Sequence, residues 1–246
     1  MTRDAGNGLI EVSELGFNRG LEAVLDVRHL HIARGQAILL TGDNGSGKTT
    51  LLKVLAGLLT ASRGVFRCLG VPMDARLAAR FCRGRHVYLH QSPYMLDASV
   101  EENIAYGLRL RGRDRTQMRV EIRDMLAWAS LEDFARRRAR ALSTGEQQRV
   151  ALTRARVLAP SLLLLDEITA NMDAASRHRV CTMITDLKQS GASVVLASHE
   201  HGALQSLCDQ RLELVRGTLR VAPGAATGSA VVPLHRDTNL SGTQRS

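Results

Sequence analysis

The stretch Gly42-Asp43-Asn44-Gly45-Ser46-Gly47-Lys48-Thr49 decides the fold of this chain, because it matches the phosphate-binding pattern G-x-x-x-x-G-K-[ST] in full. The apolar run Ala37 to Thr41 before it is typical of a buried strand. Thr49 to Ala56, followed by Gly57, is typical of a helix with glycine at its C-terminal cap. Glycines let backbone N–H groups wrap around phosphate oxygens, and the helix adds the positive end of its dipole. A glycine-rich turn without a ligand is the alternative, but a strand, loop and helix in register favour a nucleoside triphosphate site.

Two side chains of this phosphate loop carry the expected chemistry. Lys48 would place a positive charge at the β and γ phosphates, and the Thr49 hydroxyl could ligate Mg²⁺. Lys48 is also one of only three lysines, with Lys53 and Lys188, among 33 basic residues. The residues expected to line the nucleotide are Gly42, Asp43, Asn44, Gly45, Ser46, Gly47, Lys48, Thr49 and Thr50.

A pair of acids follows the apolar run Leu162 to Leu165. Ligands of α/β sheets bind in the crevice at the carboxyl ends of the strands, where this pair would lie. Asp166 would hold Mg²⁺ through water, and Glu167 would polarise the attacking water as a general base. A strand whose polar end enters a loop is the alternative, and the phosphate loop makes it the weaker one.

Short strand-like runs alternate with longer helical patterns, which indicates a parallel sheet flanked by helices. Between Ser92 and Ala159 the strand patterns vanish and two capping-box sequences of the S-x-x-E form occur, which predicts a helical insertion. Beyond about Val221 the composition shifts to small and polar residues, which predicts a mobile tail. The expected strands are Ile10 to Val12, Ala37 to Thr41, His86 to His90, Leu162 to Asp166 and Ser193 to Ala197.

The composition is that of a globular protein, with 44% of its 246 residues apolar. That length suits one large domain or two small ones, and excludes collagen, a disordered polyampholyte and a disulfide mini-protein. No apolar run approaches the roughly 20 residues that span a bilayer, and the first residues lack the apolar stretch of a signal peptide, so we expect a cytoplasmic protein. Widely spaced cysteines favour buried free thiols in a reducing compartment. They are Cys68, Cys82, Cys181 and Cys208.

Further motifs resemble those of the ATP-binding-cassette (ABC) ATPases. The run Leu142-Ser143-Thr144-Gly145-Glu146-Gln147-Gln148-Arg149-Val150 is similar to the signature motif of that family. Gln91 resembles the glutamine loop, Ala170-Asn171-Met172-Asp173 the D-loop, and Ser198-His199-Glu200 the switch-histidine motif. Six motifs in the family's order make the resemblance specific, and it covers roughly residues 9 to 221.

The resemblance implies an α/β fold: a P-loop NTPase (RecA-like) parallel-sheet core with an N-terminal antiparallel β region and an inserted α-helical subdomain. The core would span about residues 1–91 and 160–221, and the helical subdomain about 92–159. Residues 222–246 would form the flexible tail.

The resemblance also implies ATP hydrolysis with Mg²⁺ in a head-to-tail dimer that holds two ATP molecules between its subunits. Catalysis would depend on Glu167, His199 and Lys48, and the metal on Thr49, Gln91 and Asp166. The partner subunit would contact each nucleotide through its signature helix and its D-loop, with Ser143, Thr144, Gly145, Glu146 and Asp173. The start of a helix suits this contact because it offers a hydroxyl and free N–H donors to a phosphate.

Three features depart from the family pattern. Thr144 replaces the first signature glycine, Glu146 replaces a glutamine, and Ile168 stands where proline usually follows the acid pair. The residue that stacks on adenine is also displaced: the family's spacing falls on Arg19, whereas Phe17 is the nearest ring. Both can stack on a base, so the sequence leaves the two open.

A single cassette of this length resembles the ATPase subunit of a transporter whose permease is a separate polypeptide. The segment from Gln91 to Gly112 resembles importer ATPases. The run His90-Gln91-Ser92-Pro93-Tyr94-Met95 and the Thr-Ala-Asn-Met-Asp form of the D-loop are similar to those of tungstate-type oxyanion importers. The resemblance implies a homodimer at the inner face of the membrane, with a permease and an extracytoplasmic binding protein. Tyr94, Met95 and Leu96 would be exposed and form a groove for the permease, or else be ordinary core. An exporter or lipoprotein-release ATPase and a soluble regulatory ATPase are the alternatives.

The formal charge of +9 does not require a nucleic-acid partner. Only 3% of residues are aromatic, and single-strand binding platforms need rings on which bases stack. Between Ser92 and Ala159 the arginines outnumber the acids, and we interpret them as solvated surface that partly faces the permease and the anionic inner leaflet. No nucleic acid is therefore expected among the partners.

Overall fold

Two sheets organise the chain, and a computed structural model describes residues 8–199 and 202–222. The central sheet has the order β10-β9-β3-β8-β7-β6, in which the strands from β9 to β6 are parallel to one another and the edge strand β10 is antiparallel to β9. Its strands are β3 (Ala37–Thr41), β6 (His86–Leu89), β7 (Leu162–Asp166), β8 (Ser193–Ala197), β9 (Gln210–Val215) and β10 (Thr218–Val221). The residues of β3, β7 and β8 are buried without exception, as expected for parallel strands covered on both faces.

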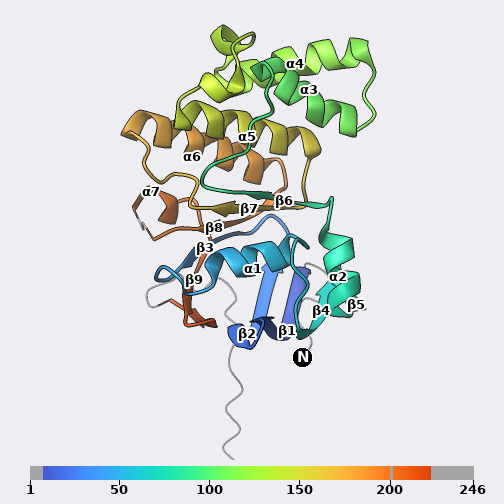
Figure 1. The fold of residues 1–246 in the computed structure, drawn as a ribbon, viewed down its shortest axis with the longest axis vertical. Helices are drawn as coiled ribbons and strands as arrows, with labels where there is room; N and C mark the ends of the chain where they lie inside the picture. Colours follow the sequence, from blue (N-terminus) through green and yellow to red (C-terminus); the bar gives the residue numbers. More distant parts are fainter. Residues whose placement is uncertain (1–7, 200–201, 223–246) are drawn as a thin grey trace, which may run out of the picture.

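The second sheet is antiparallel, in the order β2-β1-β4-β5. It consists of β1 (Gly8–Arg19), β2 (Glu22–Ala33), β4 (Arg63–Cys68) and β5 (Val71–Met73). Helix α1 (Lys48–Leu55) lies between this sheet and the central sheet, and α2 (Ala75–Cys82) lies beside β4 and β5 (Figure 1). One hydrophobic cluster joins the three layers through Val12, Leu52 and Leu164.

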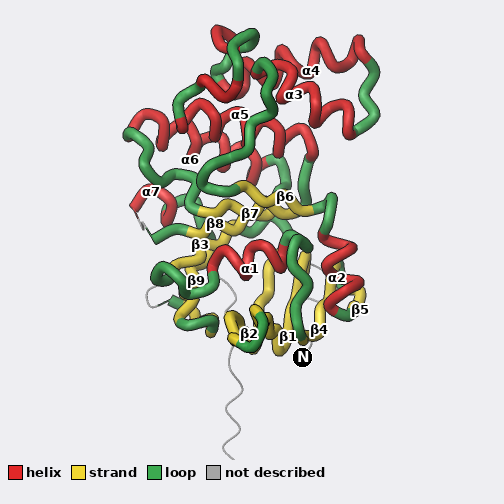
Figure 2. The backbone as a smooth tube through the Cα atoms, viewed as in Figure 1, coloured by secondary structure: helices red, strands yellow, loops and turns green. Residues whose placement is uncertain are grey.

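Helices cover the opposite face of the central sheet (Figure 2). Helices α5 (Thr144–Leu158) and α6 (Ala174–Gln189) lie next to the sheet, and α3 (Val100–Leu110) and α4 (Arg115–Ala129) pack against α5 on its far side (Figure 1). Two short 3₁₀ turns, Glu132–Phe134 and Ala139–Ala141, complete the helical region, and α7 (Gly202–Gln205) is a single turn. The two predicted capping boxes form as expected: Ser99 begins α3 with Glu102, and Ser143 begins α5 with Glu146.

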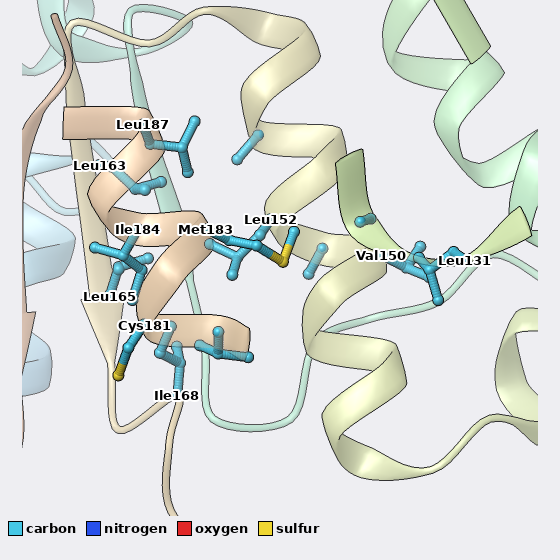
Figure 3. Close-up of a cluster of buried hydrophobic side chains, with 14 of the residues drawn as sticks. Leu131, Val150, Leu152, Leu163, Leu165, Ile168, Cys181, Met183, Ile184 and Leu187 are labelled. Atoms are coloured by element: carbon cyan, nitrogen blue, oxygen red, sulfur yellow. The ribbon is translucent and has the colours of Figure 1, made fainter. Parts of the chain in front are cut away.

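A second hydrophobic cluster fills the space between these helices and the sheet (Figure 3). On one side Leu163 and Leu165 of β7 contact the α6 layer, and on the other Val150 of α5 meets Leu131. Leu152 lies between the two groups. The helical region and the sheet are therefore joined by one continuous apolar core.

The structure confirms the predicted fold class, and the five predicted strands lie within observed ones except that β6 ends at Leu89, one residue before His90. Gly57 follows α1 with φ 72°, as the cap prediction required. The sequence did not predict β2, β4, β5, β9 or β10 individually. The predicted tail, 222–246, lies outside the described residues apart from Ala222, which is buried and donates to the carbonyl of Arg211.

The cysteine prediction is confirmed for three positions. Cys68, Cys82 and Cys181 are buried free thiols, whereas Cys208 is half-buried; burial raises the pKa of the Cys208 thiol to about 12. In the part of the chain that the structure describes, no helix is long and apolar enough to cross a bilayer.

Candidate nucleotide-binding site

The phosphate loop joins the end of β3 to the start of α1. Its backbone needs glycine at Gly42 (φ 142°) and Gly47 (φ 105°), because a Cβ at the first would meet the carbonyl oxygen of Leu214 and a Cβ at the second would lie 2.9 Å from Leu25 Cδ2. The turn between β9 and β10 braces the loop from outside, since Gly217 N–H donates to the carbonyl of Ser46 at 3.0 Å. The loop conformation is thus fixed by its surroundings.

Lys48 is held inside this loop. Its Nζ donates to the carbonyls of Gly42 at 2.6 Å and Asp43 at 3.0 Å, and the residue is only 7% exposed. An ammonium has three donors, so one remains for a ligand. The Ser46 hydroxyl is buried in the same loop without a hydrogen-bond partner among the described residues. A buried cation and an unpaired hydroxyl together fit the oxygens of a phosphate.

Asp166 accepts two hydrogen bonds at one carboxylate oxygen. The Thr49 hydroxyl donates to its Oδ2 at 2.7 Å, and the Tyr88 hydroxyl donates to the same atom at 2.8 Å. Burial and the adjoining Asp166 raise the pKa of Tyr88 well above its usual value. Hydroxyl and carboxylate oxygens side by side fit the ligand preference of Mg²⁺, which is usually held by one or two carboxylates and substrate phosphates.

Tyr88 was not among the predicted site residues. In the parallel pairing of β6 with β7, Tyr88 lies opposite Leu164, two positions before Asp166 and hence on the same face. A polar ring within an apolar strand was the available signal. Its meaning depends on which strand neighbours β7, and the sequence does not reveal that order.

Glu167 and His199 come together at the ends of β7 and β8. Nδ1 of His199 lies 2.9 Å from Oε2 of Glu167, with the histidine side chain 57% exposed and the glutamate 17%. Glu167 adopts φ 54°, which is uncommon for a residue other than glycine, and its N–H donates to the carbonyl of Ala197 at 3.0 Å. Left-handed backbone of this kind concentrates at functional sites, where the surroundings hold it in place.

Gln91 follows β6 and is tied to helix α5 through its main chain. The amide of Gln148, a fully buried residue of α5, donates to the carbonyl of Gln91 at 2.6 Å and to that of His90 at 3.3 Å. Gln148 belongs to the signature run, and its sequence position alone did not predict a role for it. It links the predicted glutamine loop to the signature helix.

The start of α5 faces outward. Ser143 and Thr144 are exposed, while Glu146 turns its carboxylate back to the N–H of Ser143 at 2.8 Å. Gly145 is buried, and a Cβ there would lie 2.8 Å from Cβ of Ser176 on α6. The second signature glycine is thus required by packing within the chain, whereas the exposed Thr144 meets no such constraint.

Asp173 caps α6, accepting hydrogen bonds from the N–H and the hydroxyl of Ser176, each at 2.8 Å. These bonds hold the pKa of Asp173 below its usual value. Its carboxylate, predicted to contact nucleotide, is therefore occupied within its own chain.

The two adenine candidates lie on β1. Phe17 is half-buried and packs on the cluster around α1, opposite Leu25 of β2, whereas Arg19 is exposed at the end of the strand. Arg19 is free to cover a base, and Phe17 offers only part of its ring.

Two groups of predicted site residues lie on opposite sides of the central sheet. Those of the phosphate loop, the acid pair and His199 lie at the carboxyl ends of β3, β7 and β8. The signature residues lie at the start of α5, across the central sheet from α1 (Figure 1).

Comparison with known proteins gives consistent results. The family model described as ABC transporter matches residues 25–170. The tungstate uptake system ATP-binding protein TupC of Peptoclostridium acidaminophilum is 33% identical over 216 residues, covering 87% of this chain and 98% of TupC. The lipoprotein-releasing system ATP-binding protein LolD 2 of Rhodospirillum rubrum is 37% identical over 194 residues, covering 76% of this chain and 84% of that protein.

Among solved structures, cbiO1 from Clostridium perfringens, part of the ABC transporter complex cbiONQ, superposes with a TM-score of 0.79 at 24% identity, covering 87% of this chain and 88% of that one. This likeness shows the fold. Together with the matched family model and the two relatives, it leads to one conclusion: the chain belongs to the ABC transporter family and is an ATP-binding subunit with the ATPase cassette of such a transporter.

Proposed function

We propose that this chain hydrolyses ATP as a head-to-tail dimer and thereby drives a separate membrane permease. One observation supports the catalytic part: the Glu167–His199 pair lies directly after the end of β7. The last residue of that strand, Asp166, accepts a hydrogen bond from the Thr49 hydroxyl. A candidate general base, its orienting histidine and a candidate metal-binding pair therefore lie at adjoining strand ends.

Each side chain has a distinct part in this proposal. Lys48 offers its free donor to the β and γ phosphates, and the loop N–H groups bind the remaining oxygens. Glu167 accepts a proton from the attacking water, and His199 holds Glu167 in position. Mg²⁺, held by Thr49, Asp166 and Gln91, would neutralise phosphate charge when bound.

The dimer completes the site. The exposed hydroxyl of Ser143 and the free N–H groups at the start of α5 suit the γ-phosphate of a nucleotide on another subunit. Within one chain α1 and α5 cover opposite faces of the central sheet, so a second copy of the chain is the natural source of these donors.

The permease would dock on the helical region, about residues 92–159. Tyr94 is 71% exposed and Tyr106 of α3 41%, and both are apolar enough to pack against a partner helix. Of the three residues expected to form the groove, Tyr94 is exposed and Leu96 is half-buried, whereas Met95 is 4% exposed and belongs to the core, the alternative that the sequence left open. The proposed docking surface therefore includes Tyr94 and Tyr106 and leaves out Met95.

For the transported solute we propose an oxyanion of the tungstate type, brought in through the permease from an external binding protein. The relation to TupC over nearly its whole length supports this. The relation to LolD 2 favours lipoprotein release as the second candidate.

The test is reconstitution of the chain in liposomes with the permease encoded beside its gene. ATP hydrolysis that rises when tungstate-loaded binding protein is added would support the proposal, while stimulation by a lipoprotein would support the second candidate. Full ATP hydrolysis without any permease would contradict the transport role. So would a Tyr94→Glu variant whose ATP hydrolysis equals that of the unchanged protein. His29→Glu, on the antiparallel sheet, is the matched control.

A further inference from the structure

We infer that Tyr88 is a positioning residue for Asp166, and that its hydroxyl sets how tightly the site takes up Mg²⁺. The inference rests on the proposed Mg²⁺ site and adds to it a residue that contacts neither nucleotide nor metal. It begins with the two hydrogen bonds that converge on Oδ2 of Asp166, from Thr49 at 2.7 Å and from Tyr88 at 2.8 Å.

The two donors differ in what they can do when the metal site is filled. A Thr49 hydroxyl that turns its oxygen toward a metal ion gives up its hydrogen bond to Asp166. Tyr88 has no such competing task, because it belongs to β6 and reaches Asp166 from the neighbouring strand. Tyr88 then supplies the hydrogen bond that continues to fix the rotamer of Asp166.

The Tyr88 ring is itself fixed in place. It packs against the hydrophobic cluster around α1, and the Nζ of Lys53 lies 5.9 Å from its ring centre. A cation at that distance is attracted to the face of the ring. Lys53 is five residues after Lys48 on α1, so two of the three lysines lie on the helix beside the nucleotide site.

This arrangement has an energetic consequence. Asp166 is 4% exposed, so bulk water cannot replace a hydrogen bond that its carboxylate loses. A hydrogen bond to a charged group is among the stronger ones in proteins. Removing the Tyr88 hydroxyl should therefore leave Asp166 free to rotate and weaken its hold on a metal-bound water, without touching the phosphate loop.

The experiment is equilibrium binding of ATP to Tyr88→Phe, made in a Glu167→Gln background so that hydrolysis during the measurement is slow. Binding is measured in EDTA and then with rising Mg²⁺, and Mn²⁺ uptake is followed by electron paramagnetic resonance. We expect ATP affinity in EDTA to stay within about twofold, and the Mg²⁺ and Mn²⁺ midpoints to rise about 10- to 100-fold, the effect of one hydrogen bond to a charged group.

Thr185→Val, which removes a half-buried hydroxyl from α6, is the matched control and should leave both midpoints unchanged. Unchanged midpoints in Tyr88→Phe would overturn the inference, as would an equal loss of ATP affinity in EDTA and in Mg²⁺, since that pattern indicates a general structural role. If the unchanged protein itself binds ATP without any dependence on Mg²⁺, the proposed metal site fails instead.

Discussion

The two halves of the nucleotide site, at the strand ends and at the start of α5, differ in how many of their polar groups find partners within one chain. At the carboxyl ends of the core strands, Lys48, Thr49, Asp166 and the Glu167–His199 pair already bind one another or the loop backbone. At the start of α5, Ser143 is exposed and its helix N-terminus faces outward. The first half is preorganised for a ligand, whereas the second has the donors for one but not the rest of a pocket. This contrast indicates a site divided between two copies of the chain.

Glu167→Gln should give the largest effect on the preorganised half. Loss of the general base should lower ATP turnover about 10² to 10⁴-fold while ATP binding persists, so that ATP-bound dimers accumulate. Phosphate release and sedimentation measure the two effects. Glu102→Gln, which changes a capping carboxylate on α3, is the control and should turn over normally. Turnover near that of the unchanged protein would remove Glu167 from its assigned role.

Lys48→Ala should weaken ATP binding in the same half. Removing a charged donor from buried phosphate contacts should weaken ATP affinity about 10- to 100-fold, measured by calorimetry. Lys188→Ala is the control, because Lys188 pairs with Asp209 at 2.7 Å outside the site. Equal affinities of the two variants would contradict the assignment of the phosphate loop.

Ser143→Ala should separate the second half from the first. ATP binding to the monomer should be unchanged, while ATP-dependent dimerisation of the Glu167→Gln protein weakens about tenfold, as expected for one hydrogen bond to a charged phosphate. Both Ser143→Ala and Ser99→Ala remove a helix N-cap, so each should cost about 1 kcal/mol of folding stability. A dimerisation defect of equal size in Ser99→Ala would show that the effect arises from helix stability alone.

Asp173→Asn should give the smallest effect, and one that depends on pH. The hydrogen bonds from Ser176 lower the pKa of Asp173 in the folded chain. The carboxylate therefore contributes its full stabilisation at pH values above the pKa of an ordinary Asp, and this contribution is lost as the pH falls through the lowered pKa of the folded chain. The difference in Tm between the unchanged protein and Asp173→Asn should therefore be greatest near pH 7 and shrink below about pH 4. A difference that is the same at pH 7 and pH 3 would contradict this assignment.

The sequence predicted the local parts of this molecule and missed those that depend on strand order. The phosphate loop and both capping boxes follow from short-range spacing, because a loop between strand and helix is specified by its own residues. Tyr88 and the bracing turn at Gly217 act on residues distant in sequence, and only the assembled sheet brings them to Asp166 and Ser46. The sequence left open whether Tyr94, Met95 and Leu96 are exposed or core. The structure exposes Tyr94 and buries Met95, because successive residues of a loop can face opposite ways.

The most direct test of a divided site mixes two defective proteins, Lys48→Ala and Ser143→Arg, both in the Glu167→Gln background. In a head-to-tail dimer of the two, one site carries both defects and the other carries neither. We expect the mixture, unlike either protein alone, to form ATP-dependent dimers that retain one tightly bound ATP each. A mixture that binds no more ATP and dimerises no better than its separate components would contradict the shared site.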